Sequence, residues 1–447
     1  MSIKPLVKST DRLTEYMGWI CLFVFTVLPF HALITTWAGS VYGHIDVFRI
    51  WKEILICILF LYSMYVLIID KGLQKRLLGS VIFRLTLLYL LITLLRTIAG
   101  YRADLVNSEA AIYGLLANLR YLAFFYVVLI ISSKTKLLKK YWAYALLGPA
   151  MIVTVFGLMQ KIVLPNDFLT NFGYSKDTIP AIHTVDSKEA YIRLQSTLRG
   201  PNPLGAYLTL ILTATIALWS KARNPSKQIY LLSLFCLSIF VMFFSFSRSA
   251  WLGTVVSLGV VGFLSLTNKR SRTLLLYGVS FGMLSFLGLV YIGQNNDFIQ
   301  NTIFHSDEKS RSAVSSNENR QSGIVAGLKD VYRHPLGQGA GSAGPASARN
   351  DRPAKISENY YIQIAQEVGI FGLITLIAIN IFVAMNLYKK RNDTLALILF
   401  ASLCGITVIN MVSHGWMDDT LSLLWWGLAG IALSERAAHK PRIIKSK

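Results

Sequence analysis

Three arginines stand in polar segments that join hydrophobic runs, where a membrane protein can hold a charged substrate. Arg248 lies in FSFSRSAWLG, Arg199 in TLRGPNPLGAYL and Arg320 in NENRQSGIVAGL. A guanidinium group can bind phosphate oxygens through two parallel hydrogen bonds and needs no metal. Arginines that converge from different segments on one cavity would therefore suit a diphosphate group. The plainer interpretation of each is a solvated or interfacial arginine.

A carboxylate and a histidine complete the set of candidate reactive groups. Glu358 and Asn359 begin the segment ENYYIQIAQEVGIFGL, at the start of an apolar run. A carboxylate there can accept a proton from an attacking hydroxyl, although Glu is also favoured at helix starts by the helix dipole. The segment SHGWMDD places His414 close to Asp418 and Asp419. These three could bind a divalent ion, but a helix cap explains them as well, and we expect no metal.

The composition indicates that these groups sit in a membrane protein. Of 447 residues, 54% are hydrophobic and only 15% are charged. A water-soluble chain cannot easily bury so much apolar surface, which excludes a soluble enzyme. The net charge of +21 comes from Lys and Arg that flank hydrophobic runs, not from a continuous basic face with interleaved aromatics. The charge therefore reflects membrane topology, and we expect membrane lipids but no nucleic acid as partners.

Twelve apolar runs approach or exceed the length of about 20 residues that crosses a hydrocarbon core. They cover residues 16–37, 48–69, 81–99, 112–132, 142–164, 204–219, 229–246, 249–267, 273–293, 360–388, 395–413 and 419–435. The prediction is an all-α polytopic bundle of about 12 transmembrane helices, forming a single integral membrane domain over residues 1–447. Asn118 and Arg120 interrupt the fourth run.

Lys and Arg are concentrated in alternate connections, which by the positive-inside rule places both termini in the cytoplasm. Two long polar segments, 165–203 and 294–359, then lie on the outer side. Within the second, Ile324, Leu328 and Val331 are spaced like one face of a helix over 318–332. The following HPLGQGAGSAGP is rich in glycine but lacks the Lys-Ser/Thr of a nucleotide-binding loop.

Three motifs, in this order and spacing, resemble the O-antigen ligase and polymerase superfamily. They are FSFSRSAWLG, then NR followed by HPLGQGAG, then ENYYIQIAQEVGIFGL, and the resemblance covers residues 195–430. It implies a multi-pass glycosyltransferase of the bacterial plasma (inner) membrane, without metal or other cofactor. The enzyme would take a glycan from undecaprenyl pyrophosphate on the periplasmic face, so that 165–203 and 294–359 become the first and second large periplasmic loops. The acceptor would be lipid A-core in a ligase, or another lipid-linked glycan in a polymerase.

The resemblance also assigns roles. The family's pyrophosphate-binding arginines fall on Arg248 and Arg320. The ligase motif has His-Asn, nine residues and Gly-x-x-Gly; here Asn359, Gly369 and Gly372 keep that spacing, while Glu358 occupies the histidine position. This departure leaves ligase and polymerase both open.

The predicted site follows from these observations. We predict Glu358, Arg248 and Arg320 as catalytic and Arg199, Asn359 and His414 as substrate-binding residues, with the choice of Glu358 or His414 as base left open. Tyr360, Tyr361 and Trp416 could stack on sugar rings or belong to an interfacial aromatic belt. The competing classes are a transporter or flippase of lipid-linked oligosaccharides, which would share the membrane spans and the substrate, and a structural scaffold, which would need none of these charged residues.

Overall fold

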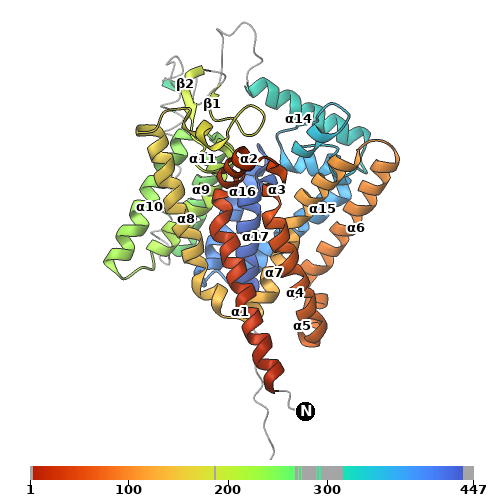
Figure 1. The fold of residues 1–447 in the computed structure, drawn as a ribbon, viewed down its shortest axis with the longest axis vertical. Helices are drawn as coiled ribbons and strands as arrows, with labels where there is room; N and C mark the ends of the chain where they lie inside the picture. Colours follow the sequence, from red (N-terminus) through yellow and green to blue (C-terminus); the bar gives the residue numbers. More distant parts are fainter. Residues whose placement is uncertain are drawn as a thin grey trace, which may run out of the picture.

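The computed structural model describes residues 4–185, 188–266 and 316–435, with a few isolated positions between 267 and 315. The described chain is all-α, as predicted, and its long helices pack side by side as one bundle (Figure 1). The helices that run along the bundle are α1 (Lys4–Val27), α4 (Trp51–Ile69), α6 (Val81–Arg102), α7 (Ser108–Lys134), α8 (Leu137–Ile162), α9 (Pro201–Trp219), α10 (Pro225–Phe244), α11 (Arg248–Ser265), α15 (Tyr360–Lys389), α16 (Thr394–Asn410) and α17 (Asp419–Leu433).

These helices correspond to eleven of the twelve predicted spans. Within the described residues, nine helical segments are long and apolar enough to cross a membrane, and α16 and α17 are shorter apolar helices. The remaining predicted span, 273–293, lies largely outside the described residues. The protein is thus a multi-pass membrane protein.

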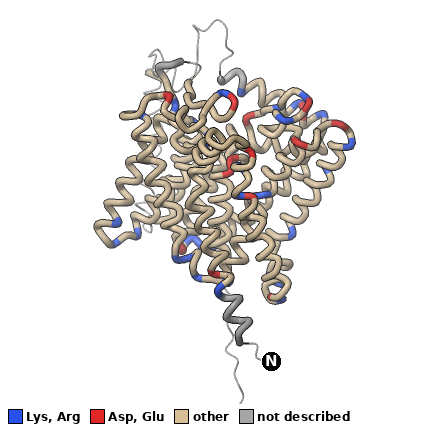
Figure 2. The backbone as a smooth tube through the Cα atoms, viewed as in Figure 1, with Lys and Arg blue, Asp and Glu red and all other residues tan. Residues whose placement is uncertain are grey.

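Shorter elements lie at the two ends of the bundle (Figure 1). We call the end with α2 (His31–Tyr42), α3 (Ile45–Arg49) and α14 (Ser316–Arg333) the upper end, and the end with α5 (Lys71–Gly79) the lower end. A 3₁₀ turn at Leu28–Phe30 separates α1 from α2. Charged residues lie mostly toward the two ends of the bundle (Figure 2), as expected for helices that cross an apolar layer.

The connection between α8 and α9 packs on the upper end. It holds a 3₁₀ turn (Phe168–Phe172) and a small antiparallel hairpin of β1 (His183–Val185) and β2 (Lys188–Arg193). Arg193 Nε donates to Ser245 O at 3.0 Å, and Leu194 N donates to Phe244 O at 2.9 Å. These bonds tie the residues before α9 to the turn between α10 and α11.

Helix α14 confirms the helix predicted over 318–332, but it packs through a different face. Leu328, from the predicted apolar face, is 54% exposed. The face toward the bundle carries Arg320, Gly323, Gly327 and Asp330, which follow one another at helical spacing of three or four residues. A Cβ on Gly327 would lie 2.7 Å from the Ile362 side chain, so glycine lets α14 approach the start of α15 closely.

The glycine-rich segment after α14 is a buried packing element. A Cβ on Gly100 of α6 would lie 2.0 Å from Gln338 O, and one on Gly114 of α7 would lie 2.2 Å from Gly341 N. Gly341 itself has a φ of +86°, which L side chains rarely adopt. The segment therefore passes between α6 and α7 where neither helix carries a side chain.

The same segment completes the hydrogen bonding of a broken helix. Gly369 interrupts α15 with a φ of 81°. Gln338 N and Gly339 N donate to the carbonyls of Gln366 and Glu367, each at 2.8 Å, and Ile370 N donates to Pro335 O at 2.9 Å. Because a membrane interior supplies no water, such internal partners are what allow a helix to break there.

The buried carboxylate of Glu367 is held beside this break. Asn118 Nδ2 donates to it at 2.7 Å and Gly341 N at 3.0 Å. This contact explains Asn118 in the fourth predicted span, because the amide on α7 meets a specific acceptor on α15.

Candidate functional site

Arg320 and Glu358 form an ion pair at the upper end. Arg320 Nε donates to Glu358 Oε2 at 2.7 Å, and the two side chains are 24% and 41% exposed. The bond occupies one nitrogen of the guanidinium and one oxygen of the carboxylate. Both groups therefore keep polar atoms that can meet a ligand from the outside.

Glu358 and Asn359 owe their positions to the start of α15. Asn359 Oδ1 accepts from Tyr361 N and Ile362 N, both at 3.0 Å, which caps the helix. Its Nδ2 donates to Met411 O at 2.6 Å and so joins α15 to the end of α16. Glu358 has a φ of 48°, a left-handed conformation that is costly for a residue with a side chain and is common at functional sites. Asn359 thus has a structural role in orienting Glu358.

His414 lies next to this ion pair, in the connection between α16 and α17. Its Nε2 atom is buried, and no described residue hydrogen-bonds to it. Burial lowers the pKa of His414 to about 4, the Glu358 carboxylate opposes this shift, and the Arg320 guanidinium adds to it. The imidazole is therefore neutral near pH 7, and its ring can act as a hydrogen-bond acceptor as well as a donor.

Arg199 precedes α9 at the same end and is exposed. Thr197 Oγ1 donates to Pro29 O at 2.8 Å, and Thr420 Oγ1 donates to Leu28 O at 3.2 Å, so one 3₁₀ turn holds both this loop and the start of α17. Burial raises the pKa of Asp418 to about 6, and the nearby Arg199 charge is among the groups that lower it. Arg199 thus lies close enough to the 414–419 segment to act on it electrostatically.

Arg248 is the first residue of α11 and is partly buried. Gly205 near the start of α9 meets Ala250, since a Cβ there would lie 2.6 Å from the Ala250 Cβ. Further along α11, a Cβ on Gly253 would lie 2.7 Å from both Gly405 O and the Ile409 side chain of α16. These contacts put Arg248 at the upper end, between the start of α9 and the end of α16.

The structure thus brings the six predicted residues to one end of the bundle, with direct contact between Arg320 and Glu358. For Tyr360 and Trp416, the structure corrects the prediction that their rings could stack on sugars. Tyr360 and Trp416 are 0% and 2% exposed. The Tyr360 hydroxyl lies 2.9 Å from that of Tyr121, which stacks on Trp416. These two rings belong to the core beneath the site.

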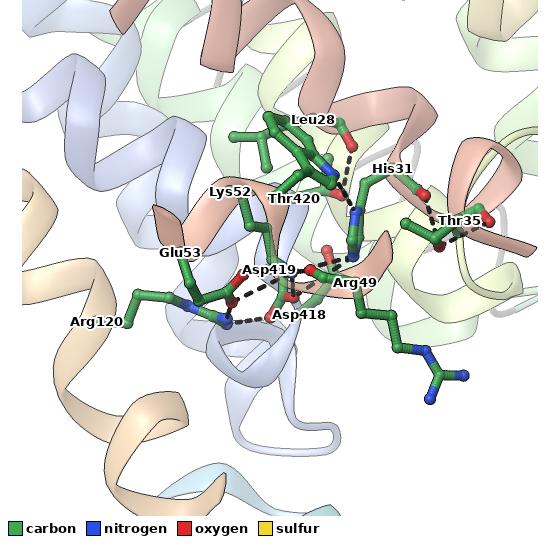
Figure 3. A network of polar contacts seen from close by, with 12 residues as sticks. Leu28, His31, Thr35, Arg49, Lys52, Glu53, Arg120, Asp418, Asp419 and Thr420 are labelled. Atoms are coloured by element: carbon green, nitrogen blue, oxygen red, sulfur yellow. Dashed lines mark hydrogen bonds and ion pairs between the residues drawn. The ribbon is translucent and has the colours of Figure 1, made fainter. Parts of the chain in front are cut away.

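A network of charged residues next to the site escaped the sequence analysis (Figure 3). Lys52 Nζ lies 3.2 Å from Glu53 and 3.1 Å from Asp419, and Arg120 contacts the same two carboxylates, at 2.6 Å for Glu53. His31 Nε2 lies 3.1 Å from Lys52 Nζ. The Lys52 side chain is only 3% exposed.

The network fixes the beginning of α17. It joins α2, α4 and α7 to Asp419, the residue that follows the Asp418 helix cap. Arg120, which interrupts the fourth predicted span, was the available signal, because a charge within a span requires a partner. The Asp419 carboxylate is paired with two cations, Lys52 and Arg120. Among the described residues, no group of three or more His, Cys, Asp or Glu is arranged to hold a metal ion.

Comparison with known families finds a match for part of the chain. A family model described as O-antigen ligase matches residues 232–377, a stretch that contains Arg248, Arg320, Glu358 and Asn359. This match covers less than half of the chain and supports membership of the O-antigen ligase superfamily. No curated protein matches the chain. The matched stretch leaves out Arg199 and His414, which the fold brings to the same end.

The match to the O-antigen ligase family indicates a general activity. It supports a ligase or glycosyltransferase-like enzyme of cell-surface glycan biosynthesis, with lipid-linked glycan and lipid A-core as the general substrates of such enzymes.

Proposed function

We propose that this protein transfers a glycan from undecaprenyl pyrophosphate to a sugar hydroxyl at the upper end of the bundle, which faces the periplasm. The proposal rests mainly on the ion pair of Arg320 and Glu358, whose partly exposed side chains combine a phosphate-binding cation and a proton acceptor. The partly buried Arg248 and the exposed Arg199 add positive charge at the same end. A donor that carries two phosphates needs such charge, and arginine supplies it without a metal.

In the proposed reaction, the acceptor hydroxyl attacks the anomeric carbon of the donor glycan. Its proton passes to the oxygen of Glu358 that Arg320 Nε does not occupy. A bond forms between the acceptor oxygen and the anomeric carbon, and the bond from that carbon to the pyrophosphate oxygen breaks. Arg248 and the free amino groups of Arg320 stabilise the negative charge that grows on the leaving lipid pyrophosphate. A single displacement of this kind inverts the anomeric carbon.

His414 has a separate role in this scheme. The neutral imidazole lies beside Glu358, and its buried Nε2 can hydrogen-bond to the acceptor sugar. We assign it to acceptor positioning and assign proton transfer to Glu358, because Glu358 is the more exposed group and lies in the matched family region.

Product analysis with purified protein in detergent tests this proposal. The wild-type protein receives a defined undecaprenyl-pyrophosphate oligosaccharide, either alone or with lipid A-core. A longer lipid-linked glycan without added acceptor identifies a polymerase, and a product that forms only with lipid A-core identifies a ligase. An unchanged donor in the presence of both acceptors contradicts the proposal and favours the flippase alternative, which a flipping assay in vesicles then measures.

A further inference from the structure

A cavity of about 220 Å³ opens at the lower end, on the opposite side of the bundle from the candidate site. Helices α5, α6, α7, α15 and α17 contribute residues to its wall, directly or from the segments next to them. By the same measure, a cavity that holds one water molecule needs about 10–15 Å³. The cavity thus has room for a sizeable polar group between helices that are far apart in the sequence.

The cavity wall combines a polar rim with an apolar interior. Arg76, Lys390 and Ser80 contribute to the polar part, and Leu77 and Phe125 contribute to the apolar part. This pairing of basic groups with an apolar wall matches an amphiphile that has a negatively charged head.

The two cations differ in how they are held. Arg76 is exposed and makes no hydrogen bond with any described residue. Lys390 Nζ lies 3.4 Å from Leu433 O and 3.8 Å from Glu435, a long and solvated ion pair. Two cations thus face one carboxylate, and the surplus positive charge favours an anion.

The pattern of helix α5 fits a position at the membrane surface. Leu73 and Leu77 are buried against the bundle, while Lys71, Lys75 and Arg76 are exposed. Asp70 caps the helix and binds Lys134 Nζ at 2.5 Å, which anchors α5 to the end of α7. A short amphipathic helix with outward lysines and arginine is typical of an interface with anionic lipid.

We propose that the cavity binds the headgroup of an anionic phospholipid. Its phosphate lies between Arg76 and Lys390, and the hydroxyl of Ser80 is within the same wall. The first part of an acyl chain lies along Leu77 and Phe125. This site is separate from the candidate site and does not depend on the proposed glycosyl transfer.

Lipid binding to the full-length protein in detergent tests the proposal by native mass spectrometry. The probes are phosphatidylglycerol, phosphatidylcholine and glycerol 3-phosphate. We expect phosphatidylglycerol to bind most tightly. Because each basic group near a lipid surface contributes about 1 kcal/mol, Arg76→Gln should weaken phosphatidylglycerol binding about fivefold, and Arg76→Gln with Lys390→Gln about 25-fold. Lys75→Gln is the matched control, since Lys75 is exposed on the same helix but is outside the cavity wall, and it should change binding less than twofold.

Three results would overturn this assignment. Equal weakening by Lys75→Gln and Arg76→Gln would indicate general attraction to a basic surface. Equal binding of phosphatidylcholine would exclude recognition of negative charge, and equal binding of glycerol 3-phosphate would identify a soluble phosphate compound as the ligand. Arg76→Gln alters an exposed side chain and leaves the packing intact, so its result decides the question even if the double variant fails to fold.

Discussion

Arg320 Nε donates a hydrogen bond to Glu358 Oε2 across 2.7 Å and so joins α14 to the start of α15. The bond depends on Gly323 and Gly327, which allow α14 to lie close to residues 356–362. It depends also on the left-handed backbone of Glu358 and on the Asn359 cap that follows. A guanidinium group and a carboxylate are thereby held together at the upper end of the bundle.

The carboxylate of Glu358 should be essential for transfer. Glu358→Gln keeps the shape of the side chain but removes the proton acceptor, and we expect the turnover rate to fall about 10²–10⁴-fold. Glu358→His introduces the residue of the ligase motif and should retain more activity than Glu358→Gln. Glu109→Gln serves as control, because Glu109 is a 57% exposed carboxylate at the same end that pairs with Arg349. Wild-type turnover by Glu358→Gln would show that another group takes the proton.

His414 should make the folded state less stable in acid. Its folded pKa of about 4 lies below its ordinary value of 6.5, so the unfolded chain gains a proton first as the pH falls. This lowers the free energy of unfolding by about 2 kcal/mol between pH 7 and pH 5. Asp418, with its pKa raised to about 6, has the opposite effect, since acid stabilises its protonated folded form. The test therefore measures the free energy of unfolding of wild type and of His414→Gln at pH 7 and at pH 5. If the difference between the two proteins is the same at both pH values, the buried neutral imidazole is contradicted.

The charged network around Asp419 should stabilise the upper end strongly. Asp419→Asn leaves Lys52 and Arg120 with only Glu53 as carboxylate partner. We expect this to lower the free energy of unfolding by about 3–5 kcal/mol. Asp46→Asn removes a carboxylate that is 72% exposed, in a pair with Arg49, and should cost at most about 1 kcal/mol. Thermal unfolding in detergent compares the two variants. Equal losses would mean that the buried network contributes no more than a surface pair.

The glycine-rich segment should tolerate no side chain where it passes α7. A Cβ on Gly341 would lie 2.1 Å from Ala110 O, so Gly341→Ala combines a clash with an unfavourable backbone and should cost about 3 kcal/mol or more. Gly43 also has positive φ, 71°, but a Cβ there meets nothing within 4 Å. Gly43→Ala should therefore cost only about 1 kcal/mol. Unfolding curves of the two variants separate the effect of the clash from the effect of the backbone conformation. Equal stability losses would contradict the close contact between Gly341 and α7.

Hydropathy was sufficient to predict most of the fold, because each membrane span must be apolar by itself. The helices that cross the bundle follow that rule. Helix α14 forms as predicted, but it packs through a face other than the predicted apolar one. The short helix α5 could not be predicted in this way, since nine residues with three cations do not resemble a span. Packing partners also could not be predicted from composition, as the buried path of the glycine-rich segment shows.

The candidate site was predicted in part. Chemistry and motif order selected Arg320 and Glu358, and the structure adds that they touch. The position of His414 beside them depends on how α16 and α17 return to α15, which local spacing does not encode. Lys52 and Glu53 were overlooked because charges at the start of a span usually face water, whereas here they meet Arg120 and Asp419 inside the bundle.

The release of lipid pyrophosphate in a single turnover tests the central claim most directly. Purified wild type, Arg320→Ala, Arg248→Ala and Arg333→Ala each receive an undecaprenyl-pyrophosphate oligosaccharide and an acceptor. Loss of one group that stabilises the leaving charge should reduce the rate about 10²–10³-fold for Arg320→Ala and for Arg248→Ala. Arg333→Ala, an exposed arginine at the far end of α14, should stay within about twofold of wild type. Release by Arg320→Ala at the wild-type rate would contradict the account.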